Sequence, residues 1–150
     1  MGLMGLRSFL RKHRRVAIDT NVFIYHVEAN PAYVDLTREV FTWLERSPHT
    51  AVTSSVTMAE LLLQPYRAGN QNLVNQYYAL LSMFPNLEWV APDLAIADTA
   101  AQIRAQYSLR TPDALQVATA MRCGATAIVT NDPHFSVIPH LEAGLLDRLR

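Results

Sequence analysis

The chain has 150 residues, 50% of them hydrophobic, and its formal net charge is zero. This length and composition predict one folded domain with a buried core, and they exclude a disordered chain. No apolar run approaches the roughly 18 residues that span a bilayer, and the single cysteine cannot form an internal disulfide, so we expect a soluble, cytoplasmic protein without a membrane partner.

The first 15 residues form a basic segment with five Lys and Arg and no acid. The other 135 residues carry eight basic and thirteen acidic residues, so the chain lacks the overall basic excess that is usual in nucleic-acid binders. Apolar residues precede the charges, which is the reverse of a secretory signal. We therefore predict a basic N-terminal extension over 1–15 and a domain over 16–150. The extension is expected to be a short amphipathic helix or a frayed arm, with a mitochondrial transit peptide or a phosphate-binding arm as alternatives.

The first predicted strand ends in a carboxylate. Residues 16–18 form a short apolar run that stops at Asp19, and Thr20 and Asn21 follow at once. This pattern predicts a buried strand with an acid at its carboxyl end, which is the edge where open α/β sheets bind their ligands.

Helical and strand patterns alternate along the rest of the chain. Apolar residues at helical spacing predict five helices, over 33–44, 56–64, 71–83, 92–107 and 111–123. Runs rich in β-branched and apolar residues predict strands between them, over 50–53, 87–91 and 125–129. Pro65 should end the second helix, whereas Thr111 as N-cap and Pro112 at the first helical position should begin the last one. The tail is expected to add an edge strand and a closing turn.

Strands that are separated by helices pair in parallel through right-handed crossovers. We therefore predict an α/β fold, a three-layer α/β/α sandwich around a central, mainly parallel sheet. The order of the strands does not follow from the pattern.

Four acids are candidates for a single site. Asp19 and Asp132 each follow an apolar strand, so both should stand at the same edge of a parallel sheet. Asp113 opens the helix that leads to the strand before Asp132, which should place it near that edge. Glu60 lies in a helix with little polar surface, where a carboxylate is costly unless it is paired or bound to a metal. Taken alone, each aspartate could be a loop or cap residue, and Glu60 could lie exposed at the rim.

If these acids converge, they require a cation. Two carboxylates about 5 Å apart repel by about 3 kcal/mol at an effective dielectric constant of about 20, so four of them must protonate or bind a positive ion. An all-oxygen ligand set without His or Cys favours Mg²⁺ or Mn²⁺ over zinc. Metal-assisted hydrolysis of a phosphodiester is the chemistry that such a site supports.

These segments resemble the PIN-domain family, in particular the VapC-type ribonuclease toxins. The resemblance runs from residue 16 to the C-terminus and is carried by Asp19-Thr20-Asn21, Glu60 in its capped helix, Thr111-Pro112-Asp113 and Thr130-Asn131-Asp132. It implies a Mg²⁺- or Mn²⁺-dependent endoribonuclease that cleaves structured RNA such as tRNA or rRNA. It also implies inhibition by a partner antitoxin and assembly as a homodimer.

The resemblance also implies residue roles. By matching position, the catalytic acids and metal ligands would be Asp19, Glu60, Asp113 and Asp132. The first and third would bind a metal ion directly, and the other two directly or through water. Thr130 and Asn21 would orient the substrate. The basic segment before the first strand is not something that the family needs.

Other protein classes fit less well. Response-regulator receivers and haloacid dehalogenases also carry an Asp after a first strand, but they need a lysine well downstream, whereas the only lysine here, Lys12, precedes the strand. The dehalogenase pattern also requires an acid where Asn21 stands. Two alternatives stay open: a non-cleaving module that binds RNA or protein on the same fold, and a PIN nuclease of RNA processing. His134 and Phe135 could contact RNA, although a loop Phe more often belongs to the core.

Overall fold

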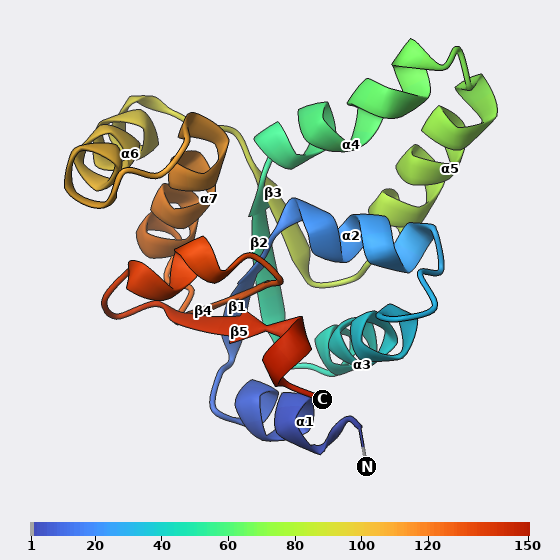
Figure 1. Cartoon of the computed structure of the whole chain (residues 1–150), viewed down its shortest axis with the longest axis horizontal. Coiled ribbons are helices and arrows are strands. Elements are labelled where there is room, and N and C mark those ends of the chain that lie inside the picture. Colours follow the sequence, from blue (N-terminus) through green and yellow to red (C-terminus); the bar gives the residue numbers. More distant parts are fainter. Residues whose placement is uncertain (1) are drawn as a thin grey trace.

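The structure, a computed structural model, describes residues 2–150. Its sheet has five strands in the order β3-β2-β1-β4-β5, and every neighbouring pair is parallel. The strands are β1 (Arg15–Ile18), β2 (Thr50–Ser54), β3 (Leu87–Val90), β4 (Ala127–Thr130) and β5 (Glu142–Leu145). The first strand is therefore central, and its carboxyl end lies between those of β2 and β4 (Figure 1).

Helices cover both faces of the sheet. They are α1 (Met4–Arg11), α2 (Thr20–Val27), α3 (Val34–Glu45), α4 (Val56–Arg67), α5 (Gln71–Ser82), α6 (Leu94–Tyr107) and α7 (Thr111–Arg122), and the C-terminal segment adds the 3₁₀ turns η1 (Pro133–Val137) and η2 (Leu146–Arg148). In Figure 1, α6 and α7 lie on one side of the sheet and α2, α3 and α4 on the other. The predicted three-layer α/β/α sandwich is confirmed. Among residues 2–150, no helix combines the length and the apolar character needed to cross a membrane.

The central strand contributes to two hydrophobic cores. Val16 and Ile18 pack in the cluster formed with α1, α2 and α3, whereas Ala17 packs in the cluster formed with α6 and α7. Successive side chains of a strand point to opposite faces of the sheet, so a strand covered on both faces must be apolar throughout. After Arg15 at the start of β1, the next polar residue is Asp19, where the chain leaves the sheet.

The N-terminal helix α1 packs against the C-terminal end of the chain. Leu6, Phe9 and Leu10 are buried in the same core cluster as Val16. The backbone N–H of Leu6 donates to the carbonyl of Leu149 at 2.8 Å. The basic segment therefore contains an amphipathic helix whose apolar side chains belong to the core.

The end of α4 and the cap of α7 differ from those predicted. The expected end of α4 at Pro65 is wrong, because the helix continues to Arg67 and the proline is buried inside it. Proline removes only its own N–H from the helix, and the following turn still closes by a bond from the N–H of Ala68 to the carbonyl of Gln64. At α7, Thr111 is the first helical residue rather than the N-cap, and no side chain caps the helix.

Replacing Leu10 by Ala should lower the free energy of unfolding by about 2–5 kcal/mol, because its side chain is 1% exposed and its removal leaves a cavity under α1. Met4→Ala, on the same helix but at a residue that is 67% exposed, should change this free energy by less than about 0.5 kcal/mol. Urea denaturation followed by circular dichroism measures both values. Equal midpoints for the two variants would mean that α1 is not part of the folded core.

Candidate active site

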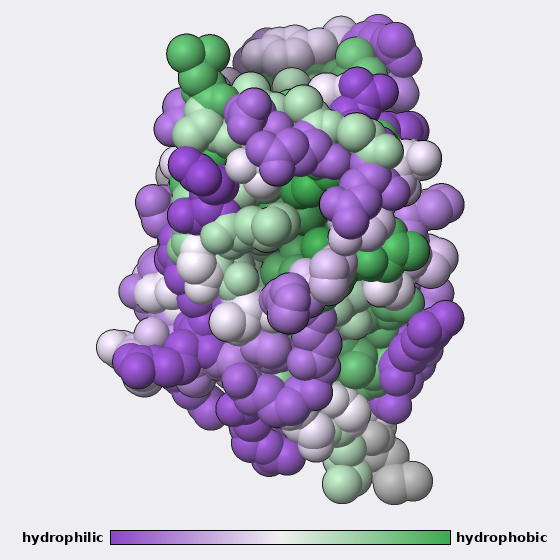
Figure 2. Space-filling view, turned by 90° about the vertical axis from the view of Figure 1, so that its left-hand side faces the viewer, coloured by the Kyte–Doolittle hydropathy of each residue, from purple (hydrophilic) through white to green (hydrophobic). Residues whose placement is uncertain are grey.

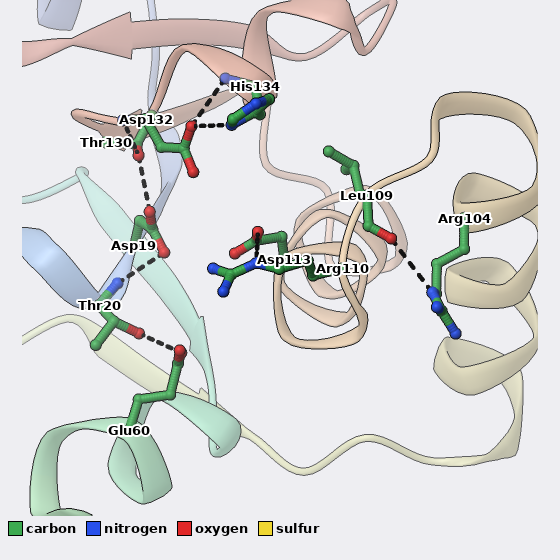
Figure 3. A network of polar contacts seen from close by, with 10 residues as sticks. All are labelled: Asp19, Thr20, Glu60, Arg104, Leu109, Arg110, Asp113, Thr130, Asp132 and His134. Carbon is green, nitrogen blue, oxygen red and sulfur yellow. Dashed lines mark hydrogen bonds and ion pairs between the residues drawn. The ribbon is translucent and has the colours of Figure 1, made fainter.

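Four structural elements bring the four acids to one edge of the sheet. Asp19 follows β1 directly, and Asp132 lies two residues beyond β4, the parallel neighbour of β1. Asp113 stands in the first turn of α7, and Glu60 lies in α4, which follows β2. Figure 3 shows the four carboxylates around a common space, with Asp113 pointing toward Asp19.

Asp19 is the most constrained of these acids. It is 8% exposed, its Oδ1 accepts the backbone N–H of Thr20 at 2.8 Å, and its Oδ2 accepts the hydroxyl of Thr130 at 2.7 Å. Burial raises the pKa of Asp19 to about 6, although both hydrogen bonds lower it, and the negative charges of Asp113 and Glu60 add to the rise. The environment therefore holds this carboxylate in place but lacks the positive charge that would stabilise it.

Glu60 reaches the site from the rim. The residue is exposed, and its carboxylate Oε1 accepts the hydroxyl of Thr20 at 2.8 Å. Of the two positions that the sequence left open for Glu60, the exposed one at the rim is therefore confirmed, and the buried side of α4 carries Thr57, Leu61 and Leu62 instead. Its place in the site depends on the bond to the residue that follows Asp19.

Asp113 and Asp132 are each held by a cationic or potentially cationic neighbour. The Asp113 side chain is 14% exposed, and its Oδ2 accepts the Nε–H of Arg110 at 3.4 Å. The Oδ1 of Asp132 accepts the backbone N–H of His134 at 2.9 Å and lies 2.7 Å from Nδ1 of the same residue. His134 is exposed beside the site, whereas Phe135 is fully buried and belongs to the core rather than to an RNA-contacting surface.

The two residues predicted to orient substrate lie beside these acids. The hydroxyl of Thr130 donates to Asp19 and accepts the backbone N–H of Asp132 at 3.0 Å, so it connects two of the acids. Asn21 lies in the first turn of α2, and its side-chain Oδ1 is buried without a hydrogen-bond partner among residues 2–150. A buried acceptor without a partner costs about 1–3 kcal/mol, so this oxygen would gain from any donor that reached it.

Sequence analysis missed a layer of polar groups beneath the acids. Thr20, Thr53, Thr57 and Gln116 are buried, and their hydrogen bonds connect α2, β2, α4 and α7. A polar residue three positions from an acid, on a helix that is otherwise apolar, is the signal that could have found Thr57 and Gln116.

The donor set fits a hard divalent cation by its chemistry, because it consists of carboxylate and hydroxyl oxygens around a buried acid with a raised pKa. The acids do not, however, close around an ion as they stand. Within residues 2–150, no three His, Cys, Asp or Glu side chains lie near enough to one another to ligate one metal ion. Hydrogen bonds from Thr20 and from His134 hold Glu60 and Asp132 at the sides of the space.

A hollow lies on another face of the molecule, away from the four acids. It has a volume of about 350 Å³ and lies between α6, the end of α7 and residues 138–140, with Ile103, Tyr107 and Met121 in its lining. Figure 2 shows the apolar surface in the middle of this face, bordered by hydrophilic residues. None of the four acids lines it, so it offers apolar contact without the chemistry of the acidic edge.

In the metal-free protein, Asp19 should make the free energy of unfolding fall as the pH rises from about 4 to about 6. Its pKa is about 6 in the folded chain against an ordinary value of 3.8, so the folded state binds this proton more tightly. The stabilisation is complete below the ordinary value and is lost as the pH rises through the folded one, a total of about 3 kcal/mol. Urea denaturation in EDTA of the wild type and of Asp19→Asn isolates this contribution as the difference between two pH profiles. A constant difference would contradict the raised pKa.

The PIN domain family model matches residues 16–141. No curated protein matches the chain in sequence. The structure of VapBC2 from Rickettsia felis, bound to a DNA fragment from its promoter, contains a similar chain, with a TM-score of 0.70 and 20% identity over 86% of this chain and 96% of that one. A chain of DNA-bound VapBC from Salmonella typhimurium matches with a TM-score of 0.65 and 24% identity, over 88% of this chain and 98% of that one. VapC20 of Mycobacterium tuberculosis is a toxin that cleaves the sarcin-ricin loop. It matches with a TM-score of 0.63 and 17% identity, over 81% of this chain and 92% of that one.

At these identities the solved structures establish a shared fold. The family match is more specific, because it begins in β1, ends before β5 and includes all four acids of the edge. The helix α1 precedes the matched range. Since the match covers most of the chain and the fold agrees, this protein belongs to the PIN-domain family.

Proposed function

We propose that this protein is a metal-dependent endoribonuclease that hydrolyses phosphodiester bonds in RNA and acts as the toxin of a toxin–antitoxin pair. The observation that carries the proposal is the buried Asp19, whose charge is destabilised by burial and by Asp113 and Glu60 at the carboxyl edge of the sheet. A site with this excess of negative charge is suited to a divalent cation and, through it, to a phosphate group.

Mg²⁺ or Mn²⁺ would be held by Asp19 and Asp113, with Glu60 and Asp132 binding directly or through water. When bound, such an ion supplies charge that activates water and stabilises the transferring phosphate and the leaving oxygen. The chain's own groups preorganise the site. Thr20 and Thr130 each occupy one oxygen of Asp19, which fixes the direction in which the remaining lone pairs point.

Three groups beside the acids would orient the substrate. Thr130 is fully buried and would act through Asp19, to which its hydroxyl donates, and the buried oxygen of Asn21 would act from the first turn of α2. Arg110 is 78% exposed in its side chain and lies beside Asp113, so it is available to bind a phosphate oxygen of the RNA backbone.

The solved structures support the proposed substrate and partner. VapC20 is described as a toxin that cleaves the sarcin-ricin loop, which favours a structured RNA such as tRNA or rRNA as the substrate here. The Rickettsia and Salmonella structures are VapBC systems, which favours a cognate antitoxin as the partner of this chain. A cytoplasmic homodimer is part of the same proposal.

A non-cleaving module that binds RNA or protein on this fold is the alternative from a different class. It would not need four acids around one space, because their repulsion only weakens the binding of a polyanion. A PIN nuclease that processes RNA without a toxin role would share the site and would differ only in lacking an antitoxin.

Asp19→Asn should reduce RNA cleavage at least about 100-fold, because it removes the charge of the most buried ligand while keeping the shape of the side chain. The matched control is Asp35→Asn, on an acid that is 76% exposed in α3 and paired only with Arg38. Cleavage of total RNA, followed by sequencing of the new ends, measures both rates and identifies the substrate. Wild-type cleavage by the Asp19 variant would remove the assignment of the site.

EDTA should abolish cleavage by the wild-type protein, and Mg²⁺ or Mn²⁺ should restore it, because the oxygen ligands select hard cations. Ca²⁺ is the control, because it carries the same charge as Mg²⁺ but takes more ligands at longer distances. It should restore little activity. RNA binding without cleavage at any metal concentration would favour the non-cleaving module. Full activity in EDTA would exclude metal-dependent hydrolysis.

A further inference from the structure

A buried hydrogen bond joins the two helices that carry Glu60 and Asp113. The side-chain Nε2 of Gln116, on α7, donates to the hydroxyl oxygen of Thr57, on α4, at 2.8 Å. Gln116 is 3% exposed and Thr57 is fully buried. We call this bond the crossbar. A polar pair in this position satisfies its hydrogen bonds inside the protein, away from water.

The crossbar lies one helical turn away from both acids. Gln116 follows Asp113 by three residues in α7, and Thr57 precedes Glu60 by three residues in α4. Residues three apart in an α-helix lie on the same side, one above the other. On each of the two helices, the acid and the crossbar residue therefore lie on the same face. The acid stands nearer the solvent, and the crossbar residue lies one turn nearer the core.

The backbone of β2 fixes the orientation of the Gln116 amide. The N–H of Ser54, at the end of β2, donates to Oε1 of Gln116 at 2.9 Å. A backbone N–H can only donate, so the atom that it meets must be the amide oxygen, and Nε2 must face Thr57. Turning the amide over would leave the buried N–H of Ser54 without an acceptor, at a cost of about 1–3 kcal/mol.

Counting the hydroxyl protons extends the crossbar to Glu60. Thr53 donates to the carbonyl of Ile18 at 2.9 Å, so its oxygen is free to accept the proton of Thr57 at 3.0 Å. The oxygen of Thr57 then accepts from Gln116, and Thr20 can donate to it as well, at 3.1 Å. Thr20 has one hydroxyl proton for two acceptors, Thr57 and the Glu60 carboxylate at 2.8 Å. Gln116 occupies one of the two lone pairs of the Thr57 oxygen, and the Glu60 carboxylate, which is nearer and charged, is the stronger acceptor for the Thr20 proton.

We propose that Gln116 is a positioning residue, which fixes the separation of Glu60 and Asp113 through the crossbar and orients the Glu60 carboxylate through Thr57 and Thr20. It touches neither substrate nor metal. The inference rests on the proposed function in one respect, that these acids hold a divalent cation. It adds that a polar contact in the interior fixes the spacing of the two helix turns that carry these acids, whose side chains would then close around the ion from fixed positions.

The decisive measurement is the affinity of the metal-free protein for Mn²⁺, by isothermal titration calorimetry without RNA. Gln116→Met keeps the length of the side chain and removes its hydrogen bonds, and it should weaken Mn²⁺ binding by about 10-fold. Thr57→Val should do the same, and Thr57→Ser, which keeps the hydroxyl, should retain wild-type affinity. The double variant Gln116→Met/Thr57→Val should lose less affinity than the sum of the two single losses, since both changes remove the crossbar.

Thr119→Val is the matched control. Thr119 is fully buried on α7 like Gln116, but its hydroxyl donates only to the carbonyl of Leu115 at 2.7 Å. It should share a loss of stability, measured by urea denaturation, while leaving Mn²⁺ affinity unchanged. If Gln116→Met does not fold, the comparison of Thr57→Val with Thr57→Ser carries the test. Equal Mn²⁺ affinity of folded Gln116→Met and the wild type overturns the proposal.

RNA cleavage separates this inference from the proposed function. Under saturating metal, Gln116→Met should lower kcat and leave KM for RNA near its wild-type value, because the three groups that orient the substrate stay in place. A wild-type protein that binds Mn²⁺ but cleaves no RNA would reject the nuclease and leave the crossbar to be judged by affinity. A wild-type protein that binds no Mn²⁺ would overturn both proposals.

Discussion

The carboxylate of Asp19, buried at the end of the central strand, is the constraint on which the site depends. Its pKa is raised to about 6 because water is excluded and because two other acids are near. Hydrogen bonds from Thr20 and Thr130 offset part of this cost, and they come from the first residue of α2 and from the end of β4. The acid at the end of β1 is thus tied to the neighbouring strand and to the helix that follows it. The folded chain thus holds in place a carboxylate whose negative charge is destabilised by its surroundings.

The sheet order explains how residues far apart in the chain reach this carboxylate. With β1 between β2 and β4, the ends of these three strands are adjacent, and the helices that follow or precede them begin at the same edge. Beneath the acids, a layer of threonine hydroxyls and one amide connects these ends. The acids can then face solvent while the side chains of Thr20, Thr53, Thr57 and Gln116 below them are hydrogen-bonded to one another, which a purely apolar layer could not provide.

The fold and the four acids could be predicted from sequence because both follow from local pattern. Apolar runs mark strands covered on both faces, and an acid after such a run must lie at the sheet edge. The pattern could not decide between a buried and an exposed Glu60. It also predicted neither the passage of α4 through Pro65 nor the polar contacts of Gln116, because these depend on which helices meet in space. The packing of α1 on Leu149 depends likewise on two segments from opposite ends of the chain.

The bond between Thr130 and Asp19 spans 111 residues of sequence, and α1 rests on a carbonyl one residue from the C-terminus. A growing polypeptide exposes β1 before β4, so Asp19 gains the hydroxyl of Thr130 only after the residues between them have been made. The acidic edge therefore cannot form from the N-terminal half of the fold alone. Incomplete translation products that end before β4 carry three of the four acids without the hydroxyl that secures the first of them.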